Sequence, residues 1–201
     1  MEQKIITNKL KFSNKELLFL ADSDLLIRKR FLQDKISSLL ELTETALEPI
    51  VSSFGKSLTN DIPQAKISKG ENYLKLPYMV LDYPALFSKK NVFAYRTMFY
   101  WGNFFSTTLH LQGKYLEKNR QRLFKATDVL INKKTYISTG VSPWHYHYGS
   151  DNYQLLSQDN CAKFLSDPFI KISDKIELDE WHNLPKIAAG NLQKILQVIT
   201  D

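Results

Sequence analysis

The chain has few of the residues that cross-link or interrupt many small proteins. Its 201 residues include one cysteine, Cys161, seven glycines and seven prolines. One cysteine excludes an intrachain disulfide. A chain of this length needs none, because it can bury roughly 70% of the surface that its unfolded form exposes. A single thiol is typical of a reducing compartment, and we therefore expect a cytoplasmic protein.

Long hydrophobic runs are also missing. No stretch approaches the ~20 apolar residues that a helix needs to span a bilayer. Residues 1–11 lack the continuous apolar core of a signal peptide. The sequence therefore predicts a protein that is not inserted in a membrane.

Catalytic and nucleotide-binding motifs are missing as well. The sequence has no Gly-x-Gly-x-x-Gly, no His-Glu-x-x-His, no pair of Cys-x-x-Cys and no Gly-x-Ser-x-Gly. Nothing indicates a cofactor, so we expect none. Whether the protein is an enzyme stays open, although these absences favour a protein without catalysis.

Charge of one sign is not concentrated. The formal net charge is +6, but 27 basic residues are interspersed with 21 acidic ones. A nucleic-acid-binding protein usually gathers its positive charge on one face. The best candidate is a basic stripe on an expected helix over 114–131, formed by Lys114, Lys118, Arg122 and Lys125. Such a stripe is more often a solvated helix face, so nucleic acid is not the expected partner and remains an alternative.

Aromatic residues are plentiful, and they cluster. Residues 73–105 carry 11 of the 25 aromatic side chains, which indicates a central sheet. Expected helices come first and clustered strands follow, which is not the alternation of a parallel sheet. We therefore predict a single α+β domain over residues 1–201. Its antiparallel sheet is centred on a 92–112 hairpin, and a long N-terminal helical segment and further helices pack on it.

The N-terminal helical segment has clear boundary signals. Ser13 and Glu16 form a capping-box pattern, and a long amphipathic helix is expected from about Ser23 to Phe54. Pro49 lies inside that pattern. Because proline lacks an N–H and clashes with the preceding turn, we expect a kink or break near it.

Gly102 and Asn103 separate the two runs of the hairpin at the spacing of a two-residue turn. A two-residue turn would pair Tyr95 with His110 on one face and Arg96 with Leu109 on the other. A slip of one residue would exchange the faces. Outside the hairpin, we expect a turn at 69–72, a connector at 83–87, a strand at 135–139 and a last helix after Asn183.

The first candidate site is the hairpin cluster of Tyr95, Arg96 and His110. An unpaired buried guanidinium would cost several kcal/mol. Arg96 is therefore expected to be paired, with Asp82 or Glu71 as partner, to lie at the sheet margin, or to face a pocket that takes an anion. A pocket lined by arginine and tyrosine would suit a ligand that carries a carboxylate or phosphate.

The second candidate site is the segment Trp144-His145-Tyr146-His147-Tyr148. On a strand, His145 and His147 would share one face and could reach one divalent cation. A third ligand is needed, and His110, Asp151 or His182 could supply it. None stands at a diagnostic spacing, so we assign no metal ligand. An amphipathic strand with solvent-facing histidines is the favoured interpretation.

These observations predict a binding domain for a small anionic ligand or a protein partner. Its expected ligand-binding residues are Tyr95, Arg96, His110, Trp144, His145 and His147. Two alternatives stay open: a metal-assisted hydrolase centred on His145 and His147, and weak nucleic-acid binding through the helix at 114–131. The sequence does not indicate the oligomeric state.

Overall fold

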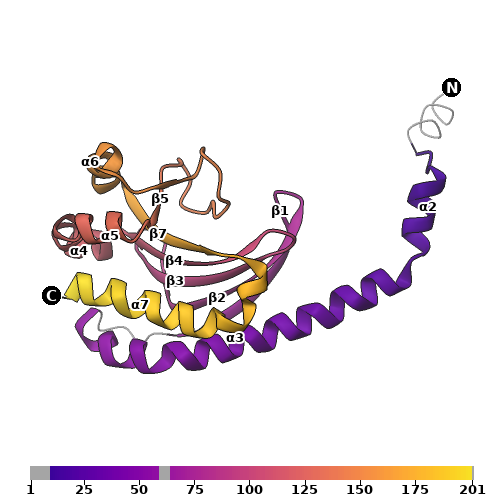
Figure 1. Cartoon of the computed structure of the whole chain (residues 1–201), viewed down its shortest axis with the longest axis horizontal. Helices are drawn as coiled ribbons and strands as arrows, with labels where there is room; N and C mark the ends of the chain where they lie inside the picture. The colour runs from indigo at the N-terminus through magenta and orange to yellow at the C-terminus, as the bar shows by residue number, and fades with distance from the viewer. Residues whose placement is uncertain (1–9, 59–63, 201) are drawn as a thin grey trace. The chain divides into compact units, whose positions relative to one another are not determined.

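The computed structural model describes residues 10–58 and 64–200 (Figure 1). The chain divides into two compact units, residues 1–36 and 37–201, which we describe separately. The prediction of one domain over residues 1–201 stays a prediction. Within the described residues, no helix combines the length and the apolar character that a membrane span needs.

The first unit is helical and consists of α2 (Asn14–Ala21) and the start of α3 (Ser23–Leu58). The predicted capping box is present: the Glu16 N–H donates to the Ser13 hydroxyl, and the Ser13 N–H donates to the Glu16 carboxylate. The Leu25 N–H donates to the Asp22 carboxylate at 3.0 Å, which caps the start of α3. The predicted break at Pro49 is wrong, because α3 continues to Leu58.

The second unit holds a seven-stranded antiparallel sheet in the order β1-β2-β3-β4-β7-β5-β6. The strands are β1 (Lys66–Tyr73), β2 (Leu76–Phe87), β3 (Val92–Tyr100), β4 (Phe104–Gln112), β5 (Tyr136–Ser138), β6 (Tyr153–Leu155) and β7 (Phe169–Ile176). The helices are α4 (Lys114–Lys125), α5 (Thr127–Asn132), α6 (Gln158–Ser166), α7 (Leu184–Thr200) and the short 3-10 helix η1 (Leu178–Asn183). The predicted α+β class is confirmed.

The hairpin exists, but its predicted register is wrong by one residue. Tyr100 pairs with Phe104, so the loop has three residues rather than two. The Asn103 N–H donates to the Tyr100 carbonyl at 3.0 Å, and Gly102 has a φ of +69°. Glycine is thus the third residue of a four-residue turn, where a type II turn requires positive φ. The slip pairs Arg96 with Thr108 and Ala94 with His110.

Other boundaries also differ from expectation. The turn expected at 69–72 lies at Leu74 and Lys75, both at positive φ, and the expected connector at 83–87 belongs to β2. The helix expected over 114–131 is interrupted at Ala126, between α4 and α5. The strand near 135–139 and the last helix are present as β5 and α7.

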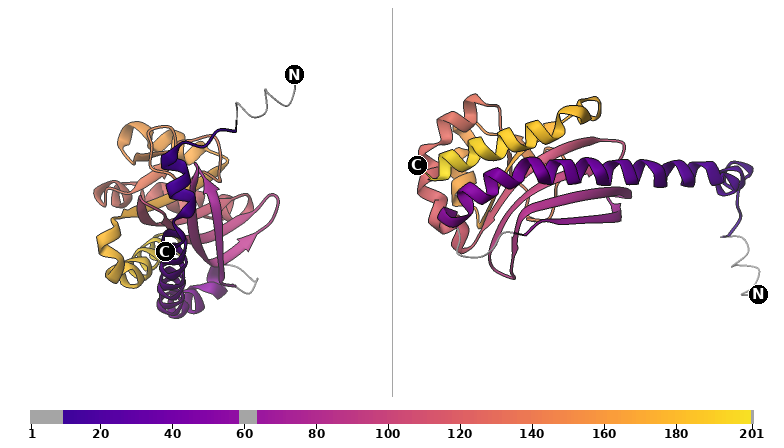
Figure 2. Two further views of the ribbon diagram at one scale, coloured as in Figure 1. Left: turned by 90° about the vertical axis from the view of Figure 1, so that its right-hand side faces the viewer. Right: turned by 90° about the horizontal axis from the view of Figure 1, so that it is seen from below.

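Helices cover one face of the sheet. In the second unit, α7 and residues 37–58 of α3 run side by side (Figures 1 and 2). The Tyr95 hydroxyl donates to the Ala188 carbonyl of α7 at 2.9 Å, so Tyr95 points to this face. The fully buried aliphatic side chains of the sheet and helices include Leu40, Leu47, Leu81, Leu109, Leu111, Leu123, Ile170 and Leu192. Burying such a side chain contributes about 1.5–3 kcal/mol.

The opposite face is covered by a loop instead. Residues 139–152 connect β5 to β6 without regular helix or strand. Tyr146 of this loop packs with Val80, Met98, Tyr100 and Phe104 of the sheet. A loop that lies on a sheet can leave polar side chains beneath it, and this is where the candidate site lies.

Candidate functional site

Polar side chains form a row across four strands on the loop-covered face. The register aligns Asp82 of β2 with Arg96 of β3, Arg96 with Thr108 of β4, and Thr108 with Ser173 of β7. Directly opposed residues share a face and lie within contact distance. The Thr108 and Ser173 hydroxyls are 2.7 Å apart. This row, together with the neighbouring pair His110 and Lys171, is called the polar strip below.

Arg96 and Asp82 form a bidentate ion pair in this row. Arg96 donates from Nε and Nη2 to the two carboxylate oxygens, at 2.8 Å each. The Asp82 side chain is 4% exposed and the Arg96 side chain 16%. Burial acts to lower the pKa of Arg96, but Tyr146 and the bonded Asp82 carboxylate raise it, so the guanidinium stays charged. Of the alternatives left open for Arg96, the structure shows pairing with Asp82.

A second row lies beside the first. His110 of β4 is paired with Lys171 of β7, and both side chains belong to fully buried residues. Burial, with the nearby cations Lys171 and Arg96, lowers the pKa of His110 to about 3. Burial, followed by repulsion from Arg96, lowers the pKa of Lys171 to about 7. At neutral pH the imidazole is therefore uncharged, and about half of the Lys171 amine is neutral.

Tyr146 of the loop inserts its ring between the two cations. Its ring centre is 4.5 Å from the Arg96 guanidinium carbon and 4.7 Å from Lys171 Nζ, distances typical of cation–π contacts. Its hydroxyl is 3.4 Å from His110 Nδ1. Because β3 and β7 lie on either side of β4, the ring stands above β4 with one cation on each side.

Lys171 is enclosed by aromatic rings rather than by acids. Besides Tyr146, the rings of Tyr153 and Phe169 lie 4.9 and 5.8 Å from Nζ. The ammonium donates to the main-chain carbonyl of His145. In the described part of the chain, no carboxylate forms an ion pair with Lys171. Asp82 is engaged with Arg96, so Lys171 has no carboxylate counter-ion among the described residues.

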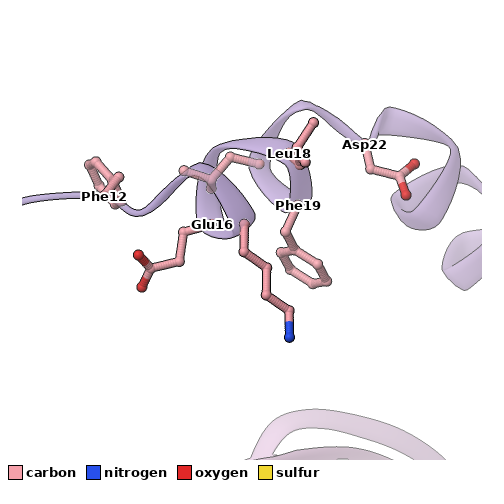
Figure 3. A pocket seen from close by; sticks show the side chains of 7 residues that line it. Phe12, Glu16, Leu18, Phe19 and Asp22 are labelled. Atoms are coloured by element: carbon pink, nitrogen blue, oxygen red, sulfur yellow. The ribbon is translucent and has the colours of Figure 1, made fainter.

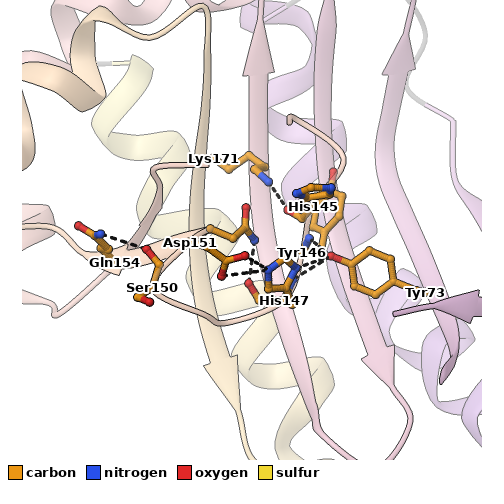
Figure 4. Close-up of polar contacts among 9 residues, drawn as sticks. Tyr73, His145, Tyr146, His147, Ser150, Asp151, Gln154 and Lys171 are labelled. Carbon is orange, nitrogen blue, oxygen red and sulfur yellow. Dashed lines mark hydrogen bonds and ion pairs between the residues drawn. The ribbon is translucent and has the colours of Figure 1, made fainter. Parts of the chain in front are cut away.

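The loop is fixed by side chains rather than by a strand ladder. The N–H groups of Tyr146 and His147 donate to the Tyr73 hydroxyl at 2.7 and 3.2 Å, and this hydroxyl lies 2.8 Å from His147 Nδ1 (Figure 4). His147 Nε2 contacts the Asp151 carboxylate at 3.1 Å, and this hydrogen bond lowers the pKa of Asp151. Tyr148 binds Ser173 at 2.5 Å. Three side chains, those of Tyr73, His147 and Tyr148, thus hold the loop on the sheet.

Some buried polar atoms beneath the loop form no hydrogen bond of good geometry. Burial raises the pKa of Tyr146 to about 12, so its phenol keeps its proton, and its hydroxyl lies beside His110 Nδ1. Among the described residues, His110 Nε2 and the Tyr153 hydroxyl form no bond of good geometry, although Gln112 approaches His110, and Thr108 and Ser173 approach Tyr153. Buried polar groups are nearly always bonded, so these atoms have hydrogen-bonding capacity that a polar ligand could use.

The structure brings some of the predicted site residues together and places others apart from them. Arg96 and His110 lie on the same face, with Trp144 5.6 Å from the His110 ring. Tyr95 lies on the helix-covered face, so its predicted pairing with His110 is wrong, because the slipped register places it opposite Leu109. His145 reaches the strip only through its carbonyl oxygen.

The predicted strand at 144–148 is also wrong, since this segment is loop. The His145 and His147 rings still lie 5.6 Å apart. Within the described residues, however, no three His, Cys, Asp or Glu side chains gather to hold a metal ion. The third ligand that the hydrolase hypothesis needs is therefore not among them.

The basic helix is partly committed to structural contacts. Arg120 of α4 donates to the carbonyls of Leu165 and Asp167. Lys118 and Lys125 are exposed, whereas Arg122 is half-buried. The basic residues predicted to form a stripe therefore lie on one helix, α4, which ends at Lys125.

Sequence reasoning missed Lys171 and Ser173 as site residues, and it placed Tyr146 in a candidate segment without giving it a binding role. A usable signal was present in β7, where Lys171 stands between Ile170 and Ile172. A lysine between two isoleucines of an inner strand lies on the face opposite to theirs. If that face is covered, the lysine is buried.

No protein-family model, curated protein or solved structure matches this chain.

Proposed function

We propose that this protein is a cytoplasmic binding domain that takes a small anionic ligand on the polar strip beneath the loop at 139–152. The observation that carries the proposal is the imbalance of buried charge. Arg96 and Lys171 flank one aromatic ring, and Asp82 compensates only one of them. A buried cation without a counter-ion is costly, and a bound anion would offset that cost.

Arg96 retains donors for such a ligand. A guanidinium has five N–H groups, and the bonds to Asp82 use Nε and Nη2. Carboxylate and phosphate groups match the remaining fork. The Nε2 atom of His110 and the hydroxyl of Tyr153 add neutral hydrogen-bonding groups on the same face.

Tyr146 occupies the space between the cations, so the ligand binds by replacing its ring. The guanidinium carbon and Nζ lie at most about 9 Å apart, because each is within 5 Å of the ring centre; two strands that flank a third are separated by a similar distance. A short dicarboxylate spans this gap better than a single small anion. The loop side chains His147 and Trp144 lie at the rim of the site when the loop opens.

The test is calorimetric titration of the full chain with succinate, oxalate and inorganic phosphate at pH 7. We expect at least one to bind, and Lys171→Met to weaken it by at least tenfold. This substitution roughly keeps the side-chain volume and removes a buried charge, so the variant should fold. The matched control is Lys175→Met on the same strand, because Lys175 is exposed and pairs with Glu177.

Two outcomes would overturn the proposal. One is that none of the three anions binds the unmodified chain. The other is that Lys171→Met binds as tightly as the unmodified chain, since the charge imbalance would then be irrelevant to the ligand.

A protein partner has separate support in the first unit. Large apolar side chains are exposed along residues 10–36, among them Leu18, Phe19, Leu20, Leu26 and Ile27. Phe12, Leu18 and Phe19 surround an open pocket beside Glu16 (Figure 3). Apolar surface of this kind marks interaction sites. Sedimentation of the full chain and of a chain lacking residues 1–22 tests it: if each sediments at its own monomer mass at every concentration, self-association through this segment is excluded.

A further inference from the structure

We propose that Lys171 is a nucleophilic amine that forms an imine with a short aldehyde or ketone carrying a carboxylate, which Arg96 holds. The inference rests on the proposed anion site and names the class of ligand that the site takes. It starts from the position of Nζ, which lies on the sheet face beside Arg96 and among the rings of Tyr146, Tyr153 and Phe169.

The surroundings of Lys171 favour the neutral amine. No carboxylate pairs with it in the described residues. Four elements face it. From the sheet, β3 contributes Arg96, whose charge is balanced by Asp82 of β2, and β4 contributes the uncharged His110. β6 contributes the Tyr153 phenol, and the loop contributes the Tyr146 phenol and the His145 carbonyl; burial raises the pKa of both phenols, so they are uncharged at neutral pH. Desolvation beside another cation is one of the known ways to activate a lysine as a nucleophile. The lowered pKa of Lys171, about 7, agrees with this geometry.

The spacing selects the ligand. The two cations lie at most about 9 Å apart, because each is within 5 Å of the Tyr146 ring centre; two strands that flank a third are separated by a similar distance. A carboxylate bonded to the guanidinium and a carbonyl carbon at Nζ fit this gap when two methylene groups lie between them. The simplest compound of this kind is 4-oxobutanoate. An aldehyde without a carboxylate gains nothing from Arg96.

The chemical step balances without an oxidant or reductant. The lone pair of Nζ forms a bond to the carbonyl carbon, and the electrons of the C=O π bond move to oxygen, which takes a proton. The resulting carbinolamine loses its hydroxyl group and the remaining N–H proton as water. The product is the imine, and water can reverse the step.

The test is reductive trapping of the full chain. The protein is incubated with 4-oxobutanoate and cyanoborohydride, which delivers hydride to the imine carbon and leaves a stable secondary amine. Peptide mass spectrometry then locates the added carboxypropyl group. We expect Lys171 to be modified at least tenfold faster than the exposed Lys175. An excess of succinate should suppress this labelling, and butanal should label Lys171 no faster than Lys175.

The pH profile gives a second readout that a structural lysine would not show. Only the neutral amine attacks, so labelling of Lys171 should rise through pH 7 and level off above about pH 8. Labelling of Lys175 should keep rising towards about pH 10, as expected for an exposed lysine. Tyr146→Ala should speed the labelling of Lys171, whereas Tyr146→Phe should not, because only the first removes the ring that fills the site.

Lys171→Arg separates the two proposals. Arginine keeps the positive charge but is no nucleophile at neutral pH, so this variant should bind succinate and form no adduct at position 171. If the unmodified chain binds succinate and yields no adduct on Lys171, the imine is excluded and the anion site stands. If neither binding nor an adduct is found, both proposals fail. Labelling spread evenly over exposed lysines also excludes the imine.

Discussion

The helical segment at 10–36 and the polar strip of the sheet depart from the usual distribution of side chains in opposite directions. The helical segment exposes large apolar residues such as Phe19 and Leu26. The strip buries Asp82, Arg96, His110 and Lys171. Globular proteins usually do the reverse, because apolar burial stabilises the fold and charge burial costs free energy.

The two departures differ in their physical consequences. An exposed leucine costs the folded chain little, because the residue is exposed in the unfolded chain as well. A buried charge costs several kcal/mol unless neighbours compensate it. The helical segment therefore indicates a surface available for contact, whereas the strip indicates charges that must be held by precise partners. Substitutions should have large effects in the strip and small ones in the segment.

The largest effect is expected from Asp82→Asn. It leaves the Arg96 guanidinium buried without its carboxylate, and breaking a buried pair typically costs about 3–5 kcal/mol. Urea denaturation at pH 7 measures the loss of unfolding free energy. The double variant Asp82→Asn with Arg96→Met should recover part of it, because no unpaired charge remains. A single variant as stable as the unmodified chain would show that Arg96 escapes to solvent.

The next effect is an acid-sensitive loss of stability that depends on His110. Its folded pKa of about 3 lies below the unfolded value of about 6.5. Between these values the unfolded chain binds more protons, so stability falls as the pH falls. The loss amounts to about 3 kcal/mol by pH 4. His110→Gln does not titrate, so its unfolding free energy should fall less between pH 7 and pH 4. Parallel curves for the two proteins would contradict a buried neutral imidazole.

The sequence was sufficient for the fold class and for the elements with strong local signals. The Ser13 capping box, the helix that follows Asn183 and the two runs of the hairpin depend on neighbouring residues, and each is present. The loop length was not fixed locally. Gly102 satisfies the positive φ of either a two-residue or a three-residue loop, and the choice shifted every cross-strand pair by one residue.

The candidate site was predictable only in part, for the same reason. Arg96, with Asp82 as its partner, could be found because a buried guanidinium requires a carboxylate. Lys171 could not, because its position beside His110 depends on β4 pairing with β7, 60 residues later in the chain. Tyr146 was expected on a strand but lies in a loop. No local sequence pattern predicts the path of that loop, and the path determines what the Tyr146 ring contacts.

A smaller effect should follow from Lys171, with the same sign of pH dependence but in a higher pH range. Its folded pKa of about 7 lies below the unfolded value of about 10.4. The unfolded chain again binds more protons between these values, so stability rises with pH, by about 2 kcal/mol from pH 7 to pH 9. Lys171→Met should lack this rise. Urea titrations of both proteins at pH 7, 8 and 9 measure the difference, and Lys175→Met is the control that should retain it.

The smallest effect is expected in the helical segment. Leu26 is 66% exposed, and Leu26→Ser should change the unfolding free energy by no more than about 0.5 kcal/mol, as surface substitutions usually do. Leu81→Ser makes the same chemical change at a fully buried position of β2 and should cost at least about 2 kcal/mol. Both are measured by urea denaturation at low protein concentration. A large loss for Leu26→Ser at that concentration would mean that this leucine is covered in the folded protein. A loss of unfolding free energy that grows with protein concentration would instead show that a second copy of the chain covers this leucine, because association stabilises the folded state by mass action.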